Sequence, residues 1–183
     1  RDVAPYSILA STFTNKAAGQ MRERIEGLIG PVVKAMWSGT FHSMMARLLR
    51  REAPKLGYTS SFTIYDSADS ERLVTHILKE STLSASRFKP SQVRHAISRA
   101  KDELLGPDAL EGSGRWDLRQ IAPIYAQYQR HLREANAMDF DDLIGNAVAA
   151  LRIDEVAAYY RHRWRHVLVD EFQDTNAAQF ELV

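Results

Sequence analysis

Apolar residues in this chain fall into two patterns, short continuous runs and longer stretches with helical spacing. Continuous runs at 8–13 and 167–169 predict short buried strands of a parallel sheet, because such strands are covered on both faces. The run 32–40 is predicted to be another strand, ending at Gly39. Strands separated by helical stretches predict an α/β fold that is predominantly helical overall.

Helical spacing dominates the stretch between the first two predicted strands. Asn15 is expected to cap a helix here, because its side chain can accept hydrogen bonds from the first free backbone N–H groups. The pair Gly30-Pro31 is expected to end that helix. The apolar residues expected on its inner face are Ala18, Met21, Ile25, Leu28 and Ile29.

A second helix is expected to follow Thr40, with an apolar face turned inward and arginines turned outward. The inward residues are Phe41, Met45, Leu48 and Leu49. The outward residues are Arg47, Arg50 and Arg51. An arginine cluster of this kind is either a solvated face or a contact with DNA.

Residues 66–135 carry helical spacing with no further strand pattern, after a brief extended piece at 62–65. Three helices are expected, and the residues that open them are Asp66 or Ser67, then Pro90, then Asp117. Pro123 is expected to bend the third helix or to delay its start. Residues 106–115, rich in glycine, are expected to form an exposed loop.

The acidic residues at 139–142 have a structural explanation. Asp139 is expected to cap a helix that carries Phe140, and Asp142 lies at the third position of that helix. A carboxylate there favours the positive end of the helix and contributes roughly 0.3–1 kcal/mol. A further helix, carrying Val156 and Tyr160, is expected before the strand 167–169.

The composition is that of an ordinary globular protein and excludes several kinds of site. The chain has 183 residues, of which 45% are hydrophobic and 26% charged, enough for one large domain or two small ones. The absence of cysteine excludes disulfides and thiol zinc sites, and a cytoplasmic location is expected. No apolar run is long enough to span a membrane. A strand is expected to begin at His166, so no metal site is expected from His162 and His166.

Charge is unevenly distributed, although the net charge is only +1. Residues 1–100 hold 15 Lys and Arg against 8 Asp and Glu, whereas residues 101–183 hold 9 against 15. A basic half suits a polyanion and an acidic half suits Mg²⁺, although two solvated surfaces would give the same counts. The cations that either line DNA or are simply solvated are Lys89, Arg94, Arg99 and Lys101.

Asp170 and Glu171 directly follow the predicted strand 167–169. Ligands of open α/β sheets bind beyond the carboxyl ends of the strands. In a nucleotide triphosphatase, one acid at this position holds Mg²⁺, directly or through water, and the second orients or deprotonates the attacking water. A strand followed by a polar turn would show the same pattern, so the wider sequence decides between the two interpretations.

Four stretches, in order along the chain, resemble motifs of the UvrD/Rep/PcrA helicases of superfamily 1. Residues 12–18 (TFTNKAA) resemble motif Ia, and residues 39–43 (GTFHS) resemble motif Ib. Residues 170–176 (DEFQDTN) resemble motif II, which is also called Walker B. Residues 138–143 (MDFDDL) resemble the segment that precedes motif II in that family.

The resemblance implies a partial RecA-like parallel sheet with an inserted all-α domain similar to the family's domain 1B. The RecA-like part would comprise residues 1–57 and 138–183, and the inserted domain would comprise residues 58–137. The chain has no Gly-x-x-x-x-Gly-Lys-Ser/Thr phosphate loop, and motifs III to VI would follow residue 183. A helicase fragment, closest to the PcrA/UvrD branch, is therefore expected, with an open sheet edge where the phosphate-loop strand is absent.

The resemblance also implies an ATP-dependent helicase that moves 3′ to 5′ on single-stranded DNA and unwinds duplex DNA, in repair or replication. ATP and Mg²⁺ are the implied cofactors, and DNA-repair proteins are possible partners. The roles that it implies are Glu171 in catalysis, Asp170 on Mg²⁺, Gln173 near the nucleotide, and Phe13, Thr14, Asn15, Thr40 and His42 on DNA.

Two other functions compete with this interpretation. Without a phosphate loop, the isolated chain would be a DNA- or partner-binding module with no catalysis. An unrelated Mg²⁺-dependent nuclease would cleave DNA without nucleotide, using the acids Asp139, Asp141, Asp170 and Glu171. Without the family, residues 13–15 are a capped strand–helix turn, and His42 is a helix-start histidine with a local partner.

Overall fold

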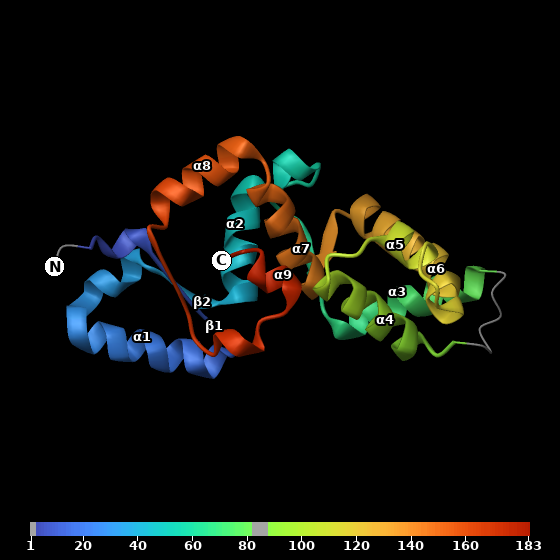
Figure 1. Cartoon of the computed structure of the whole chain (residues 1–183), viewed down its shortest axis with the longest axis horizontal. Coiled ribbons are helices and arrows are strands. Elements are labelled where there is room, and N and C mark those ends of the chain that lie inside the picture. The colour runs from blue at the N-terminus through green and yellow to red at the C-terminus, as the bar shows by residue number, and fades with distance from the viewer. Residues whose placement is uncertain (1–2, 82–87) are drawn as a thin grey trace.

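Two groups of elements make up the computed structural model, which describes residues 3–81 and 88–183. One group is a parallel sheet with helices on both faces, and the other is a group of helices beside it (Figure 1). The strands are β1 (Ile8–Thr12), β2 (Trp37–Thr40), β3 (Thr63–Tyr65), β4 (Ala137–Asp139) and β5 (His166–Val169). The α-helices are α1 (Asn15–Ile29), α2 (Phe41–Glu52), α3 (Ser67–Glu80), α4 (Pro90–Asp102), α5 (Pro107–Glu111), α6 (Trp116–Glu134), α7 (Phe140–Leu151), α8 (Asp154–Arg163) and α9 (Ala177–Phe180). The 3-10 turns are η1 (Pro5–Ser7), η2 (Gly30–Ala35), η3 (Ala53–Leu56) and η4 (Phe172–Asp174).

The first sheet has the order β2-β1-β5, and all its strands are parallel. Successive side chains of a strand point to opposite faces, so Leu9 packs in the core with α2, α7 and α8, whereas Ala10 packs on the side of α1. The register places Thr12 opposite Thr40 and Ser11 opposite Val169. The predicted α/β arrangement is confirmed, and the carboxyl ends of all three strands meet at one edge.

Strand β5 is less buried than its continuous apolar run predicts. Leu168 is 58% exposed and Val167 is 38% exposed. The strand itself was predicted correctly, but it lies at the end of the sheet, and among the described residues no strand pairs with its free side. The prediction of full burial was therefore wrong, whereas the expected open edge is present.

The helices α3, α4, α5 and α6 share a second hydrophobic core. Its centre includes Val74, Ile97, Tyr128 and Leu132, all at most 2% exposed. The expected loop 106–115 contains the helix α5 instead, because one of its turns buries Leu110 in this core. Helix α6 begins at Trp116, so Pro123 does not delay it; the proline ring sits on the exposed side of the helix.

The short strands β3 and β4 pair in parallel where the two groups of elements meet. The extended piece at 62–65 is confirmed as β3. Strand β4 was not predicted, because Ala137 and Met138 lack the β-branched and aromatic residues that mark Thr63–Tyr65. Tyr58 and Phe62 belong to the core of the first group. The boundaries at residues 58 and 137, and the RecA-like and 1B-like identities, stay predictions.

The first helix and the turn after it differ from expectation in two ways. Leu28 is 84% exposed and Ile29 is 45% exposed, so the inner face of α1 is formed by its earlier residues, of which Met21 and Ile25 pack beside Ala10. Residues 30–35 form the 3-10 turn η2 rather than the start of a strand. Pro31 suits the first position of a helical turn, and this turn buries Val33 beside Met36.

The arginine cluster on α2 has local partners. The guanidinium groups lie over aromatic rings, Arg47 over Trp37 at 4.3 Å, Arg50 over Phe62 at 3.9 Å and Arg51 over Tyr159 at 4.1 Å. Arg50 also donates to the carbonyl oxygen of Phe62 at 2.6 Å. These contacts explain the arginines structurally without DNA. Among residues 3–81 and 88–183, no helix is both long and apolar enough to cross a membrane.

Candidate functional site

The candidate site lies at the edge where β1, β2 and β5 end. Because the strands are parallel, the turns that follow them emerge on the same side of the sheet. Residues 13–15 follow β1, residues 41–43 follow β2, and Asp170 and Glu171 follow β5. The residues to which the sequence assigned DNA and nucleotide roles are thus brought to one edge.

Thr14, rather than Asn15, caps helix α1. The Thr14 hydroxyl accepts a hydrogen bond from the Ala17 amide at 3.1 Å, and Asn15 is the first helical residue. Both residue types are good caps, but only Thr14 has the extended backbone that a cap requires. Asn15 keeps an exposed side chain. Phe13 is half-buried, with its ring 5.7 Å from that of Phe41.

The start of α2 forms the second part of the edge. Thr40 caps the helix by accepting a hydrogen bond from the Ser43 amide at 3.3 Å, and a hydroxyl that accepts one bond can still donate another. His42 lies with its ring 5.7 Å from that of Phe140, which is 48% exposed. Burial lowers the pKa of His42, and the nearby Asp141 carboxylate opposes that change. His42 is thus a neutral imidazole with an aromatic neighbour at neutral pH.

Asp170 and Glu171 form the third part of the edge. The Asp170 amide donates to the carbonyl oxygen of Ser11 at 2.9 Å, which continues the β1–β5 ladder by one residue. Glu171 then adopts a left-handed backbone (φ 53°, ψ 44°), a conformation that costs a residue other than glycine roughly 1–3 kcal/mol. Both acids are exposed. Strain of this kind is concentrated at functional sites, which favours a functional role for Glu171.

The residues after Glu171 form a compact loop. The Gln173 side-chain amide donates to a Glu171 carboxylate oxygen at 2.5 Å. The Thr175 hydroxyl donates to the carbonyl oxygen of Phe172 at 2.8 Å. Asn176 caps α9 by accepting from the Gln179 amide at 2.8 Å, and its side-chain amide donates to Asp102. The loop is therefore held at one end by β1 and at the other by the last residue of α4.

A buried charged cluster lies behind this edge, formed by Lys101, Asp139 and Asp142. The Lys101 ammonium lies 2.6 Å from Asp139 and 2.8 Å from Asp142, and its side chain is only 5% exposed. The Tyr128 hydroxyl donates to Asp139 at 2.8 Å, and the Gln129 amide donates to Asp142 at 3.1 Å. The prediction that Lys101 is solvated or lines DNA was wrong.

The charges of this cluster stabilise one another. Burial works against the charged form of Lys101, but Asp142 and Asp139 outweigh it and raise the pKa of its ammonium. Burial raises the pKa of Asp142, and Lys101 opposes that rise. Asp139 also caps α7, as expected, through its hydrogen bond from the Asp142 amide at 2.8 Å. The two acids therefore serve the fold.

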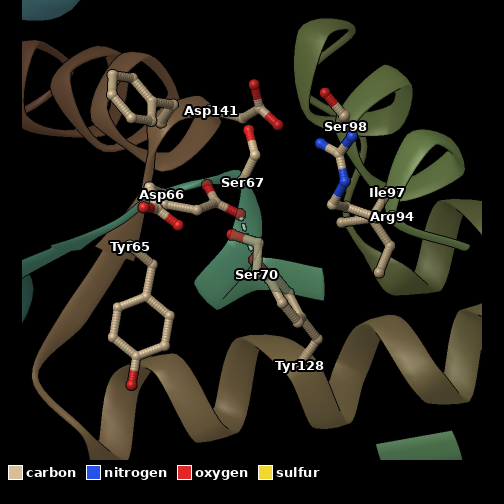
Figure 2. Close-up of a pocket in the computed structure, with 11 residues that line it drawn as sticks. Tyr65, Asp66, Ser67, Ser70, Arg94, Ile97, Ser98, Tyr128 and Asp141 are labelled. Carbon is tan, nitrogen blue, oxygen red and sulfur yellow. Dashed lines mark hydrogen bonds between the residues drawn. The ribbon is translucent and has the colours of Figure 1, made fainter. Parts of the chain in front are cut away.

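A pocket of about 120 Å³ lies next to the cluster, between β3, α4, α6 and the start of α7. Figure 2 shows Arg94 and Ser98 of α4 across this pocket from Ser67 and Asp141. Asp66, Asp139 and Asp141 line it with Arg94, so carboxylates outnumber the cation. Whether Arg94 lines DNA or is solvated stays a prediction.

Comparison with known proteins fits this arrangement. A family model described as the UvrD/REP helicase N-terminal domain matches residues 1–183, the whole chain. The chain belongs to the UvrD/REP helicase family. The ATP-dependent DNA helicase UvrD1 of Mycobacterium tuberculosis is 50% identical over 189 residues, which cover 100% of this chain and 24% of the relative. The ATP-dependent DNA helicase PcrA of Staphylococcus aureus is 42% identical over 185 residues, which cover 100% of this chain and 25% of the relative.

Membership of the UvrD/REP family suggests how to interpret the sheet edge where β1, β2 and β5 end. The chain contains only part of such a protein. The chain spans about a quarter of the length of these curated relatives. Among the described residues, no group of three or more His, Asp or Glu side chains is placed to hold a metal ion. Mg²⁺ needs only one or two carboxylates when phosphate oxygens and water complete its shell, so Asp170 and Glu171 fit a magnesium–nucleotide complex.

Sequence analysis of this UvrD/REP chain missed three residues near the site. Phe140 was assigned to a helix without a surface role, yet its exposed ring lies beside His42. Lys101 follows Ile97 by four residues, and this spacing was the available signal that it faces the core. Asn176 gave no signal of its contact with Asp102, because 74 residues separate the two.

Proposed function

We propose that the chain is part of an ATP-dependent DNA helicase whose Asp170 and Glu171 act in ATP hydrolysis. The observation that carries this proposal is the meeting of two kinds of residue at one sheet edge. Exposed acids follow β5, while an aromatic ring, hydroxyls and an imidazole follow β1 and β2. DNA bound at the turns after β1 and β2 would then lie on the same edge as the hydrolytic acids.

In this proposal, Asp170 binds the Mg²⁺ of the nucleotide, and the ion neutralises charge on the phosphates. Glu171 orients the attacking water and accepts its proton, as an exposed carboxylate can do when no cation among residues 3–81 and 88–183 pairs with it. Gln173 already contacts Glu171 and is placed to hold that carboxylate or to approach the nucleotide. The sequence contains no phosphate-loop pattern, so in this proposal its residues supply only the acidic half of an ATP site.

Single-stranded DNA is proposed to cross the turns that follow β1 and β2. Phe13 offers a ring on which a base can stack, at a gain of roughly 1–3 kcal/mol per base. Thr14, Asn15, Thr40 and His42 would contact the backbone as polar groups. Phe140 extends this surface, because its exposed ring lies against His42. The same proposal includes movement 3′ to 5′ along single-stranded DNA and unwinding of duplex DNA. It also includes a role in DNA repair or replication, with repair proteins as partners in the cytoplasm.

The isolated chain supports a second function. Without a phosphate loop it has no complete nucleotide site, whereas its DNA-facing turns are formed by its own residues. We therefore infer that the isolated chain binds single-stranded DNA weakly and does not turn over ATP.

A nuclease is disfavoured on physical grounds. Asp139 is buried, and its carboxylate already interacts with Lys101, Tyr128 and the amide of Asp142. One of the four acids that a nuclease would use to bind metal is therefore already occupied by structural contacts.

Steady-state ATP hydrolysis tests the proposal, measured for the chain and for the full-length protein with and without single-stranded DNA. The expected result is that the full-length protein hydrolyses ATP and the isolated chain does not. Single-stranded DNA should stimulate the hydrolysis by the full-length protein. Duplexes with a 3′ or a 5′ single-stranded tail then report polarity. A full-length protein that binds DNA but does not hydrolyse ATP would contradict the helicase proposal and favour the binding module.

A further inference from the structure

A continuous series of contacts runs from the proposed DNA surface to the loop that holds Glu171. It begins at His42, whose ring lies 5.7 Å from that of Phe140, the first residue of α7. Asp139 caps this helix and Asp142 is its third residue, and both bind Lys101 of α4 at 2.6 Å and 2.8 Å. The first half of the series thus joins the start of α2 to the end of α4.

The second half of the series leaves α4 by the next residue. Asp102 is the last residue of α4, and its carboxylate accepts a hydrogen bond at 2.5 Å from the side-chain amide of Asn176. Asn176 also caps α9, so both ends of its side chain are occupied. Helix α9 packs against both α4 and α7. Neighbouring residues of α4 therefore face two elements, Lys101 the start of α7 and Asp102 the start of α9.

The position of Glu171 depends on this second contact. Asp170 is held by the sheet through Ser11, but the left-handed backbone of Glu171 turns the chain away from the sheet. From there to Thr175 the loop is closed by its own hydrogen bonds, including the Asp174 amide to the carbonyl oxygen of Glu171 at 2.9 Å. Two contacts tie the loop to elements outside it: the Phe172 ring lies 6.0 Å from that of Phe180 in α9, and Asn176 binds Asp102, which joins the loop to α4.

We propose that Asp102 and Asn176 are positioning residues that couple DNA binding at the start of α2 to the geometry of Glu171. This inference rests on the proposed helicase function. Bound DNA would fix the start of α7 through Phe140, the Lys101 cluster would transmit that position to the end of α4, and Asp102 would set the loop through Asn176. Packed side chains and hydrogen bonds with two discrete arrangements carry coupling of this kind.

A shorter route competes with this one. Phe13 lies two residues after Ser11, whose carbonyl oxygen binds the Asp170 amide, so DNA on Phe13 could act on the acids through β1 directly. That route ends at Asp170 and leaves Glu171 to the loop. The two routes therefore differ in what a change at Asp102 or Asn176 does to hydrolysis.

The test uses the full-length protein and two variants that break the contact from either side. Asp102→Ala removes the acceptor, and Asn176→Ser removes the donor while serine still caps α9. Asp102→Asn is the conservative control, because its side-chain oxygen still accepts from Asn176. Glu111→Ala removes an exposed carboxylate elsewhere in the helical group. ATP hydrolysis is measured with and without single-stranded DNA, well below the thermal midpoints of all the variants.

The expected result is a loss of DNA-stimulated kcat of roughly threefold to tenfold in Asp102→Ala and Asn176→Ser. The KM for ATP and the Kd for single-stranded DNA stay within about twofold, because neither residue contacts ligand. The double variant loses no more than either single variant, since one hydrogen bond is removed in each case. Asp102→Asn and Glu111→Ala hydrolyse ATP like the unmodified protein.

Two outcomes would overturn the inference itself. DNA-stimulated hydrolysis that is unchanged in both single variants would assign the coupling to β1. Losses that multiply in the double variant would show that the two residues act separately. If Glu171→Gln abolishes hydrolysis and the contact variants do not alter it, only this inference fails. An unmodified protein without DNA-stimulated hydrolysis would remove the proposed function itself.

Discussion

Two pairs of acids in this chain lie at the carboxyl ends of short parallel strands, and the structure gives them opposite environments. Asp139 and Asp142 adjoin β4 and are buried, with Lys101 within 2.8 Å of each. Asp170 and Glu171 follow β5 and are exposed, and no cation is bound to either among the described residues. The environment of each pair therefore decides which pair is free to act on a ligand.

The contrast shows what separates a structural carboxylate from a catalytic one. A buried carboxylate is stable only when its hydrogen bonds and charge are satisfied, and then it has no free position for a ligand. An exposed carboxylate in a strained turn is not required to balance a buried charge and is available for chemistry. The buried pair therefore contributes to stability, and the exposed pair is proposed to contribute to hydrolysis.

The largest effect on stability is expected from Lys101→Ala. This change leaves Asp139 and Asp142 buried without their cation, which destabilises the fold by about 3–5 kcal/mol. Urea denaturation measures the difference. Arg99→Ala, two residues earlier on the exposed side of α4, is the control and should stay within about 0.5 kcal/mol. A Lys101→Ala protein as stable as the control would contradict the structural role of the cluster.

A smaller effect, on DNA affinity, is expected from Phe13→Ala. Loss of one stacked base should weaken single-strand binding by about 1–3 kcal/mol, with little dependence on sequence. Fluorescence anisotropy with a labelled oligonucleotide measures the Kd. Tyr6→Ala is the matched control, because this aromatic ring is 57% exposed but lies before the opposite end of β1. Equal losses in the two variants would remove the assignment of Phe13.

Ser11→Ala is expected to raise stability slightly. The Ser11 hydroxyl is buried and has no hydrogen-bond partner among the described residues, and such an unsatisfied group costs about 1–3 kcal/mol. Alanine removes the group, so the free energy of unfolding should rise by about 1 kcal/mol. Ser7→Ala is the control with the opposite sign, because the buried Ser7 hydroxyl donates to Ala4 at 2.7 Å. A destabilised Ser11→Ala protein would show that a partner exists.

The smallest effect is a pH dependence due to His42. Burial lowers its pKa in the folded state, so the unfolded state binds more protons between that value and the ordinary value of about 6.5. The contribution of neutral His42 to the free energy of unfolding is complete when the pH is above the unfolded-state pKa. It is lost as the pH falls through the lower pKa of the folded state. Unfolding measured at several pH values should show a weaker acid slope for His42→Gln. His95→Gln, on an exposed histidine, should retain the slope.

Local patterns sufficed for much of the fold. Continuous apolar runs located β1 and β5, and capping residues located the starts of α3 and α7 at Asp66 and Asp139. These features depend on neighbouring residues, so one sequence carries them. The candidate edge could also be predicted, because parallel strands place their following turns together.

The errors have tertiary causes. Leu168 has an apolar strand pattern but lies at a sheet edge, and its exposure depends on which strand pairs beside it. Lys101 is charged, yet it is buried, because it forms ion pairs with two acids that lie 38 or more residues away in sequence. Thr14 and Asn15 are both good caps, and only the backbone conformation decides between them. Contacts between distant residues determine each of these outcomes.

The central claim is that Glu171, unlike the buried acids, serves chemistry rather than the fold. Its most direct test is ATP hydrolysis by the full-length Glu171→Gln protein at saturating single-stranded DNA. The expected kcat is lower by about 10²–10⁴-fold, because glutamine cannot accept a proton, while thermal stability and DNA affinity stay unchanged. Hydrolysis at the rate of the unmodified protein would contradict the claim and return Glu171 to the role of a polar turn residue.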